Sequence, residues 1–102
     1  MKVKDVFILQ QAVDDLQEAR SFYELQESGI GEYFWDCLIS DIESLIIYAG
    51  IHNKSSGFYC MYSKRFPYVI YYEITDDIAY VAAVLSMRRN PVWIEGRLNQ
   101  GI

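Results

Sequence analysis

The fold is decided by residues 64–91, which read KRFPYVIYYEITDDIAYVAAVLSMRRNP. Two aromatic and β-branched runs, about residues 66–74 and 78–86, are separated by the turn-forming residues 75–77, and this pattern predicts a β-hairpin. Alternation along the first run places five large apolar side chains on one face, at positions 66, 68, 70, 72 and 74. Such a face requires cover, so we expect a second layer to pack on it.

The second strand of this hairpin runs directly into Arg88 and Arg89, which places two guanidinium groups side by side where the strand ends. Adjacent arginines repel each other unless an anion is near, so we expect this pair to bind a partner or target, supported by Arg65, Trp93 and Arg97. The alternatives stay open: the arginines could pair within the hairpin or stay solvated, and Trp93 could pack in the core.

Residues before the hairpin predict a strand and two helices. Residues 3–9 are typical of a short strand, and from Ala12 the apolar residues recur with the helical period as far as the glycines at positions 29 and 31. Asp14 and Asp15 fall in the first turns, where negative charge suits the helix dipole. A second apolar stripe predicts a helix over residues 32–49, and so short a connection between two helices makes them antiparallel.

Together with a further strand over about residues 57–63, these elements give the order β-α-α-β-β-β. We therefore predict one α+β domain over residues 1–102: a mostly antiparallel sheet of about four strands with the helical hairpin packed on one face, followed by a tail over about residues 92–102. We expect the outward-facing tyrosines, Tyr59 and Tyr71, to be covered by a partner or a second copy.

Composition excludes several classes of protein. No run of about 18 apolar residues exists, and the N-terminus shows no signal-peptide pattern, so we expect a cytoplasmic protein with no membrane span. The only cysteines, Cys37 and Cys60, form no zinc-ligand pattern, and His52 is the only histidine. We expect two free thiols in a reducing compartment, a surface histidine, and neither metal nor cofactor.

The formal charge of −5 is unevenly distributed: residues 1–53 hold three basic and ten acidic side chains, whereas residues 54–102 hold six and four. Nucleic-acid binders gain affinity from clustered lysine and arginine. The acidic total therefore argues against direct, general nucleic-acid binding and confines any positive surface to a local patch.

The residues placed above resemble the RelE/ParE superfamily of toxins from bacterial type II toxin–antitoxin modules, also known as plasmid stabilisation proteins. The resemblance covers residues 1–93 and is carried by Ala12, Asp15-Leu16, Ala19, Phe22-Tyr23, Gly29, Gly31, Phe34, residues 65–72, and Ala83-Val84-Leu85 followed by residues 88–91. It implies the α+β fold and a cognate antitoxin that wraps across the toxin. RelE-like members cleave messenger RNA on the ribosome, and ParE-like members poison DNA gyrase.

The resemblance favours the ParE-like members. Where RelE-like toxins carry two catalytic arginines and a catalytic tyrosine, this chain has Val69, Met87 and Trp93, and Ser86 stands where many relatives have histidine. It therefore implies a toxin without catalytic residues that acts by protein binding, with the antitoxin, gyrase and a second copy as expected partners. Two alternatives remain: a ribosome-dependent ribonuclease using Arg65, Arg88 and Arg89 as substitute cations, and a non-toxic relative that keeps only the binding surface.

Overall fold

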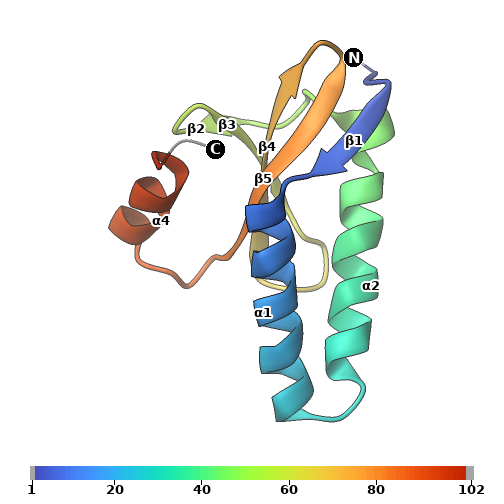
Figure 1. Cartoon of the computed structure of the whole chain (residues 1–102), viewed down its shortest axis with the longest axis vertical. Coiled ribbons are helices and arrows are strands. Elements are labelled where there is room, and N and C mark those ends of the chain that lie inside the picture. The colour runs from blue at the N-terminus through green and yellow to red at the C-terminus, as the bar shows by residue number, and fades with distance from the viewer. Residues whose placement is uncertain (1, 101–102) are drawn as a thin grey trace.

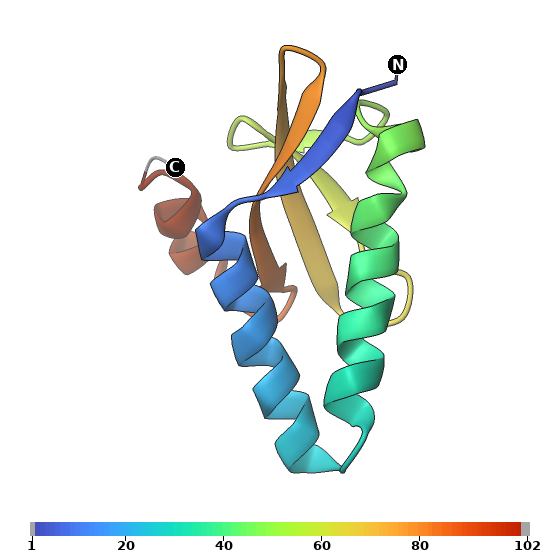
Figure 2. The same cartoon turned by 45° about the vertical axis from the view of Figure 1, so that its right-hand side comes forward.

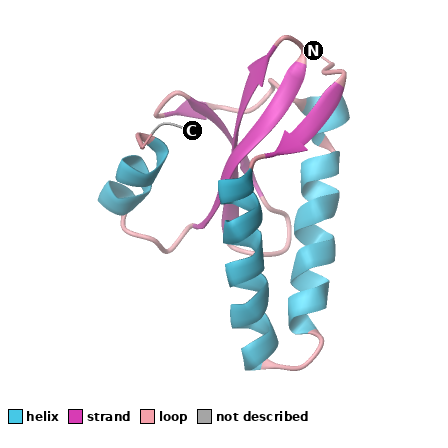
Figure 3. Cartoon of the chain, viewed as in Figure 1, coloured by secondary structure: helices cyan, strands magenta, loops and turns pink. Residues whose placement is uncertain are grey.

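The computed structural model describes residues 2–100 and contains one five-stranded sheet with helices on both sides (Figure 1). The strands are β1 (Asp5–Ile8), β2 (Lys54–Ser55), β3 (Phe58–Tyr62), β4 (Tyr68–Thr75) and β5 (Ile78–Ser86). The helices are α1 (Gln10–Gln26), α2 (Ile30–Glu43), α3 (Leu45–Tyr48) and α4 (Pro91–Leu98), distinguished from the strands by colour in Figure 3. No helix within residues 2–100 is long and apolar enough to cross a membrane.

The strand order is β1-β5-β4-β3-β2, and β4 pairs with β5 as the predicted antiparallel hairpin. The α+β class and the mostly antiparallel sheet are confirmed, with β1 parallel to β5. The sheet has five strands rather than about four, because the polar connector contributes the two-residue strand β2 at the edge beside β3.

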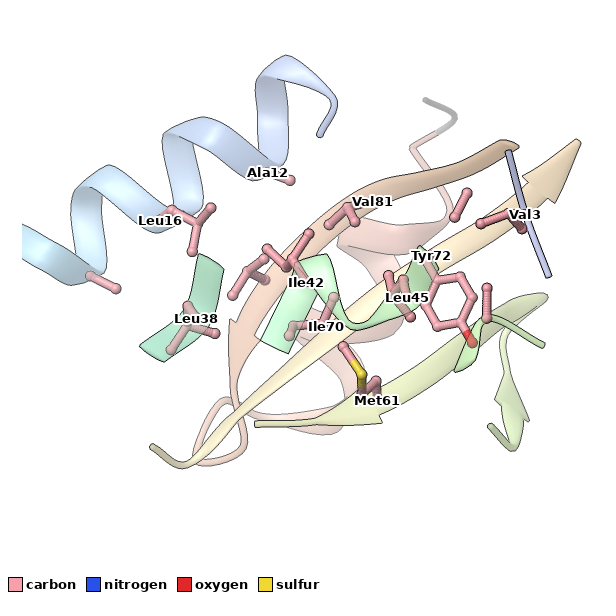
Figure 4. Close-up of a cluster of buried hydrophobic side chains, with 14 of the residues drawn as sticks. Val3, Ala12, Leu16, Leu38, Ile42, Leu45, Met61, Ile70, Tyr72 and Val81 are labelled. Carbon is pink, nitrogen blue, oxygen red and sulfur yellow. The ribbon is translucent and has the colours of Figure 1, made fainter. Parts of the chain in front are cut away.

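The helical hairpin covers the face of β4 that the alternation identified. Ile70 and Tyr72 are fully buried there, and Phe66, Tyr68 and Ile74 are partly buried against the same cluster. Figure 4 shows this cluster between the helices and the sheet, with α1 contributing Leu16 and α2 contributing Leu38 and Ile42. Phe66 precedes the strand, which begins at Tyr68 because Pro67 has no N–H for the ladder.

A register shift between β4 and β5 lies beside Tyr71 and Tyr72, which oppose Ala83 and Val81. Ala82 is the extra residue of this bulge, so the alternation of β5 changes phase there. Val81 and Val84 consequently both face the helical hairpin, whereas Ala83 and Leu85 face the other side of the sheet.

The helical hairpin packs on one face as predicted, and the other side of the sheet is covered by α4, in the segment predicted as a tail. Leu98 and Ile94 of α4 pack with Val69 and Tyr71 in a second buried cluster, so Tyr71 needs no partner protein to cover it. Tyr59 also does not face outward, because its ring stacks on Tyr72 at 5.1 Å between centroids. The predicted tail is thus an eight-residue helix as far as Leu98, and residues 101–102 lie outside the described residues.

The predicted second helix is divided in two at Ser44. The Ser44 hydroxyl donates a 2.6 Å hydrogen bond to the carbonyl oxygen of Asp41, three residues earlier. A hydroxyl bonded to its own helix backbone often bends the helix, and α3 here continues separately over Leu45–Tyr48. The antiparallel arrangement of α1 and α2 is confirmed, and the end where they are joined projects beyond the sheet (Figure 2).

The turn between α1 and α2 depends on Glu24. Its carboxylate accepts hydrogen bonds from the backbone N–H groups of Gly29 and Gly31. Gly31 is tightly enclosed, because a Cβ there would lie 2.6 Å from the Arg20 carbonyl oxygen and 2.8 Å from Glu24 Cβ.

We predict that Gly31→Ala lowers the free energy of unfolding by about 2 kcal/mol, since backbone atoms must move to admit the methyl group. The matched control is Gly96→Ala in α4, where a Cβ would have nothing within 4 Å and helix propensity favours alanine. Urea denaturation measures both. Equal stability of Gly31→Ala and the native protein would contradict the close contact.

His52 is not simply solvated: its Nδ1 atom makes a hydrogen bond with the hydroxyl of the buried Tyr72. That hydroxyl also accepts the Gly50 backbone N–H at 2.9 Å, so its proton is available to neutral Nδ1. Burial lowers the pKa of His52 from its ordinary 6.5.

We therefore predict that acid destabilises the native protein relative to His52→Gln. Well above pH 6.5 the imidazole is neutral in both folded and unfolded chains, so the difference in unfolding free energy is constant. As the pH falls below that value, the unfolded chain takes up the proton first and native stability drops. Denaturation midpoints across this pH range test it; parallel curves would refute the coupling.

Candidate functional site

A groove of about 520 Å³ lies where α1, the ends of β4 and β5, and α4 meet. It brings together four of the five residues expected at a binding site, namely Arg88, Arg89, Trp93 and Arg97. The remaining lining residues are Asp15, Glu18, Ala19, Phe22, Tyr23, Pro67, Tyr68, Val84, Leu85 and Ser86. We call this the α1–α4 groove.

Arg97 has an internal structural partner. Its two terminal nitrogens donate hydrogen bonds of 2.8 and 2.9 Å to the two carboxylate oxygens of Asp15 on α1. Both side chains are largely buried, 16% and 13% exposed, and Asp15 additionally accepts the Val84 backbone N–H at 3.0 Å. The pair therefore joins α4 to α1 and β5, and Arg97 has little capacity left for a ligand.

Arg89 is partly engaged. Its guanidinium lies over the ring of Trp93, 4.2 Å from the centroid, and 3.9 Å from the Glu18 carboxylate. The ion pair is long and exposed, so it contributes little, whereas the contact with the indole orients both side chains. Trp93 remains 41% exposed and presents an aromatic surface in the groove.

Arg88 follows a well-defined turn. Its backbone N–H donates to Ser86 Oγ at 3.1 Å, and the next N–H donates to the Ser86 carbonyl oxygen at 3.2 Å. Its side chain is exposed, and it makes no ion pair with any residue between 2 and 100.

Tyr68 also lines the α1–α4 groove, and Tyr23 beside it belongs to α1. Burial, together with the neighbouring Tyr23 hydroxyl, raises the pKa of Tyr68 to about 12, although Arg89 acts in the opposite direction. Tyr68 is therefore a neutral phenol at physiological pH, able to donate one hydrogen bond but unsuited to act as a base.

Arg65 is not part of this site. It lines a separate groove of about 310 Å³ with residues of α2, including Asp36 and Asp41. Asp41, which is only 8% exposed, accepts the Ser63 hydroxyl at 2.8 Å and the Lys64 backbone N–H at 3.3 Å. These bonds hold the segment before β4 against α2, which places Arg65 on that side.

The acidic residues of the groove were not among the predicted site residues. For Asp15 we predicted only a favourable interaction with the helix dipole, and for Glu18 no role at the site. Both nevertheless lie beside the predicted arginines. Five groove residues come from α1, and predicting this required knowing that α1 packs beside the end of β5. Among residues 2–100, no cluster of three or more His, Cys, Asp or Glu side chains could hold a metal ion.

We predict that Asp15→Ala lowers the free energy of unfolding by about 3 kcal/mol, because it leaves the Val84 N–H without its acceptor and Arg97 with only a 3.4 Å hydrogen bond to the Gln11 carbonyl oxygen. The control is Glu32→Gln, which removes an exposed ion pair with Arg20 and should cost about 0.5 kcal/mol. Thermal or urea denaturation gives both values. Similar costs for the two variants would show that the buried pair does not hold α4.

The chain is similar to a known protein family and to a solved structure. A family model described as the ParE toxin of the type II toxin–antitoxin system, parDE, matches residues 6–91. A solved structure from the chromosomal ParDE TA system of P. aeruginosa matches with a TM-score of 0.74 at 11% identity, covering 80% of this chain and 94% of that chain. No curated protein matches. The structural likeness concerns the fold alone, but the family model spans both helices of the hairpin, the sheet and Arg88-Arg89, and the chain therefore belongs to the ParE toxin family.

Proposed function

We propose that this protein is a toxin that acts in the cytoplasm by binding a protein target, with DNA gyrase as the expected target, and that a cognate antitoxin neutralises it. Membership of the ParE family supports the class. The observation that carries the binding mechanism is the α1–α4 groove, where the exposed Arg88 lies beside the Arg89–Trp93 stack.

The positions that would carry ribonuclease chemistry support binding rather than cleavage. Val69 is only 5% exposed and is packed in the cluster under α4, so its side chain is not accessible to a substrate. Met87 and Trp93 are exposed but have no group that titrates near neutral pH.

The substitute cations considered for a ribonuclease also fail to converge. Arg88 and Arg89 line the α1–α4 groove, whereas Arg65 lines the groove beside α2. A cleavage site needs its acid, base and cationic groups around one phosphate, so this separation favours the binding mechanism.

We predict that inducible expression of the protein halts growth, and that an antitoxin encoded beside it restores growth. The purified protein should inhibit supercoiling by gyrase while cellular transcripts stay intact. Arg88→Gln combined with Arg89→Gln should weaken inhibition about tenfold or more, since two charge-assisted contacts are lost.

Lys4→Gln combined with Lys54→Gln is the matched control, because it removes the same charge outside the groove. Codon-phased cuts in ribosome-bound transcripts would instead identify a ribonuclease. Antitoxin binding without growth arrest or gyrase inhibition would identify a non-toxic relative, and either outcome overturns the proposal.

A further inference from the structure

The three arginines of the α1–α4 groove differ in what they have left to bind. Arg97 is bonded to Asp15 through both terminal nitrogens, and Arg89 is stacked on Trp93 with Glu18 at 3.9 Å. Arg88 alone among the three has no ion pair within residues 2–100. The groove therefore offers one guanidinium to an external anion.

The backbone that carries Arg88 is held at several points. The Met87 N–H donates to the Pro67 carbonyl oxygen at 2.8 Å, and Ser86 accepts the next two N–H groups through Oγ and its carbonyl oxygen. Asn90 then caps α4 by accepting the Val92 N–H at 2.8 Å. Little backbone freedom would be lost when an anion binds here, which favours specific recognition.

The groove also presents apolar surface from two helices. Phe22 on α1 is 54% exposed and Trp93 on α4 is 41% exposed, and both rings line it. Large exposed aromatic side chains in a concave site are typical anchors for an apolar side chain of a partner protein.

The charge of the lining selects the kind of anion. Three arginines are set against Asp15 and Glu18, which leaves about one net positive charge. Nucleic acid would need several cations spaced along its backbone, and the chain as a whole carries −5. A single carboxylate on a peptide matches this groove better than a series of phosphates.

We propose that the α1–α4 groove binds a peptide segment carrying one acidic side chain next to an apolar one, with Arg88 pairing with the carboxylate and the rings of Phe22 and Trp93 contacting the apolar side chain. The proposal rests on the proposed function, in which this segment belongs to the antitoxin. It specifies the chemistry of the partner, which family membership alone leaves open.

The test is selection of a random peptide library displayed on phage against the native protein, Arg88→Gln and Lys4→Gln. Native protein and Lys4→Gln should both select peptides with Asp or Glu beside Leu, Ile, Phe or Trp, because Lys4 lies at the opposite end of β5. A selected peptide, synthesised, should bind Arg88→Gln about tenfold more weakly, with the difference shrinking as salt is raised.

Charge reversal makes the assignment specific. The peptide with its acidic residue changed to Lys should lose binding to the native protein and regain it with Arg88→Glu. A neutral or basic consensus, no selected peptide, equal binding by Arg88→Gln, or tighter binding of single-stranded RNA than of the peptide would each overturn the proposal. These readouts do not involve growth or gyrase, so a non-toxic protein that passes them would refute toxicity while leaving the peptide site intact.

Discussion

The edge of β5 that pairs with β1 has no strand partner beyond the end of β1, and there the carboxylate of Asp15 accepts a backbone hydrogen bond from β5. β1 pairs with β5 only as far as Val81, and Val84 further along donates its N–H to Asp15 on α1. An unpaired N–H on a partly buried strand edge costs free energy. The same carboxylate binds Arg97, so one side chain both completes the sheet edge and fixes the position of α4.

The α1–α4 groove follows from that interaction. With α4 held against α1, its residues Leu98 and Ile94 cover the second face of the sheet, and Trp93 lies where Arg89 can stack on it. Both walls of the groove thus depend on a contact between residues 82 positions apart in the chain. Stability and the candidate binding surface are coupled through α4, and variants of Asp15 are expected to affect both.

Local pattern was enough to predict the hairpin of β4 and β5, its buried face and the helical pair, because each depends on neighbouring residues and period. The sequence also contains a signal for α4, in the segment predicted as a tail: Asn90 is an N-cap residue and Pro91 suits the first helical position. The bulge at Ala82 and the Asp15–Arg97 pair had no local signal, since both depend on how distant segments meet. The position of Arg65 outside the groove had no local signal either, because it depends on the bonds that Asp41 accepts from its segment and that hold this segment against α2.

The contrast between the acidic chain and its basic groove bears on how a partner would be chosen. At physiological salt, exposed charges are screened beyond about 8 Å, so only charges near the bound group matter. An extended polyanion lying along the surface would come close to many acidic side chains, whereas a carboxylate docked in the groove is affected mainly by Arg88. The net charge of −5 and the guanidinium of Arg88, the groove arginine that has no ion pair among residues 2–100, therefore act in the same direction. They disfavour extended nucleic acid and favour a short acidic segment whose apolar neighbours contribute the remaining affinity.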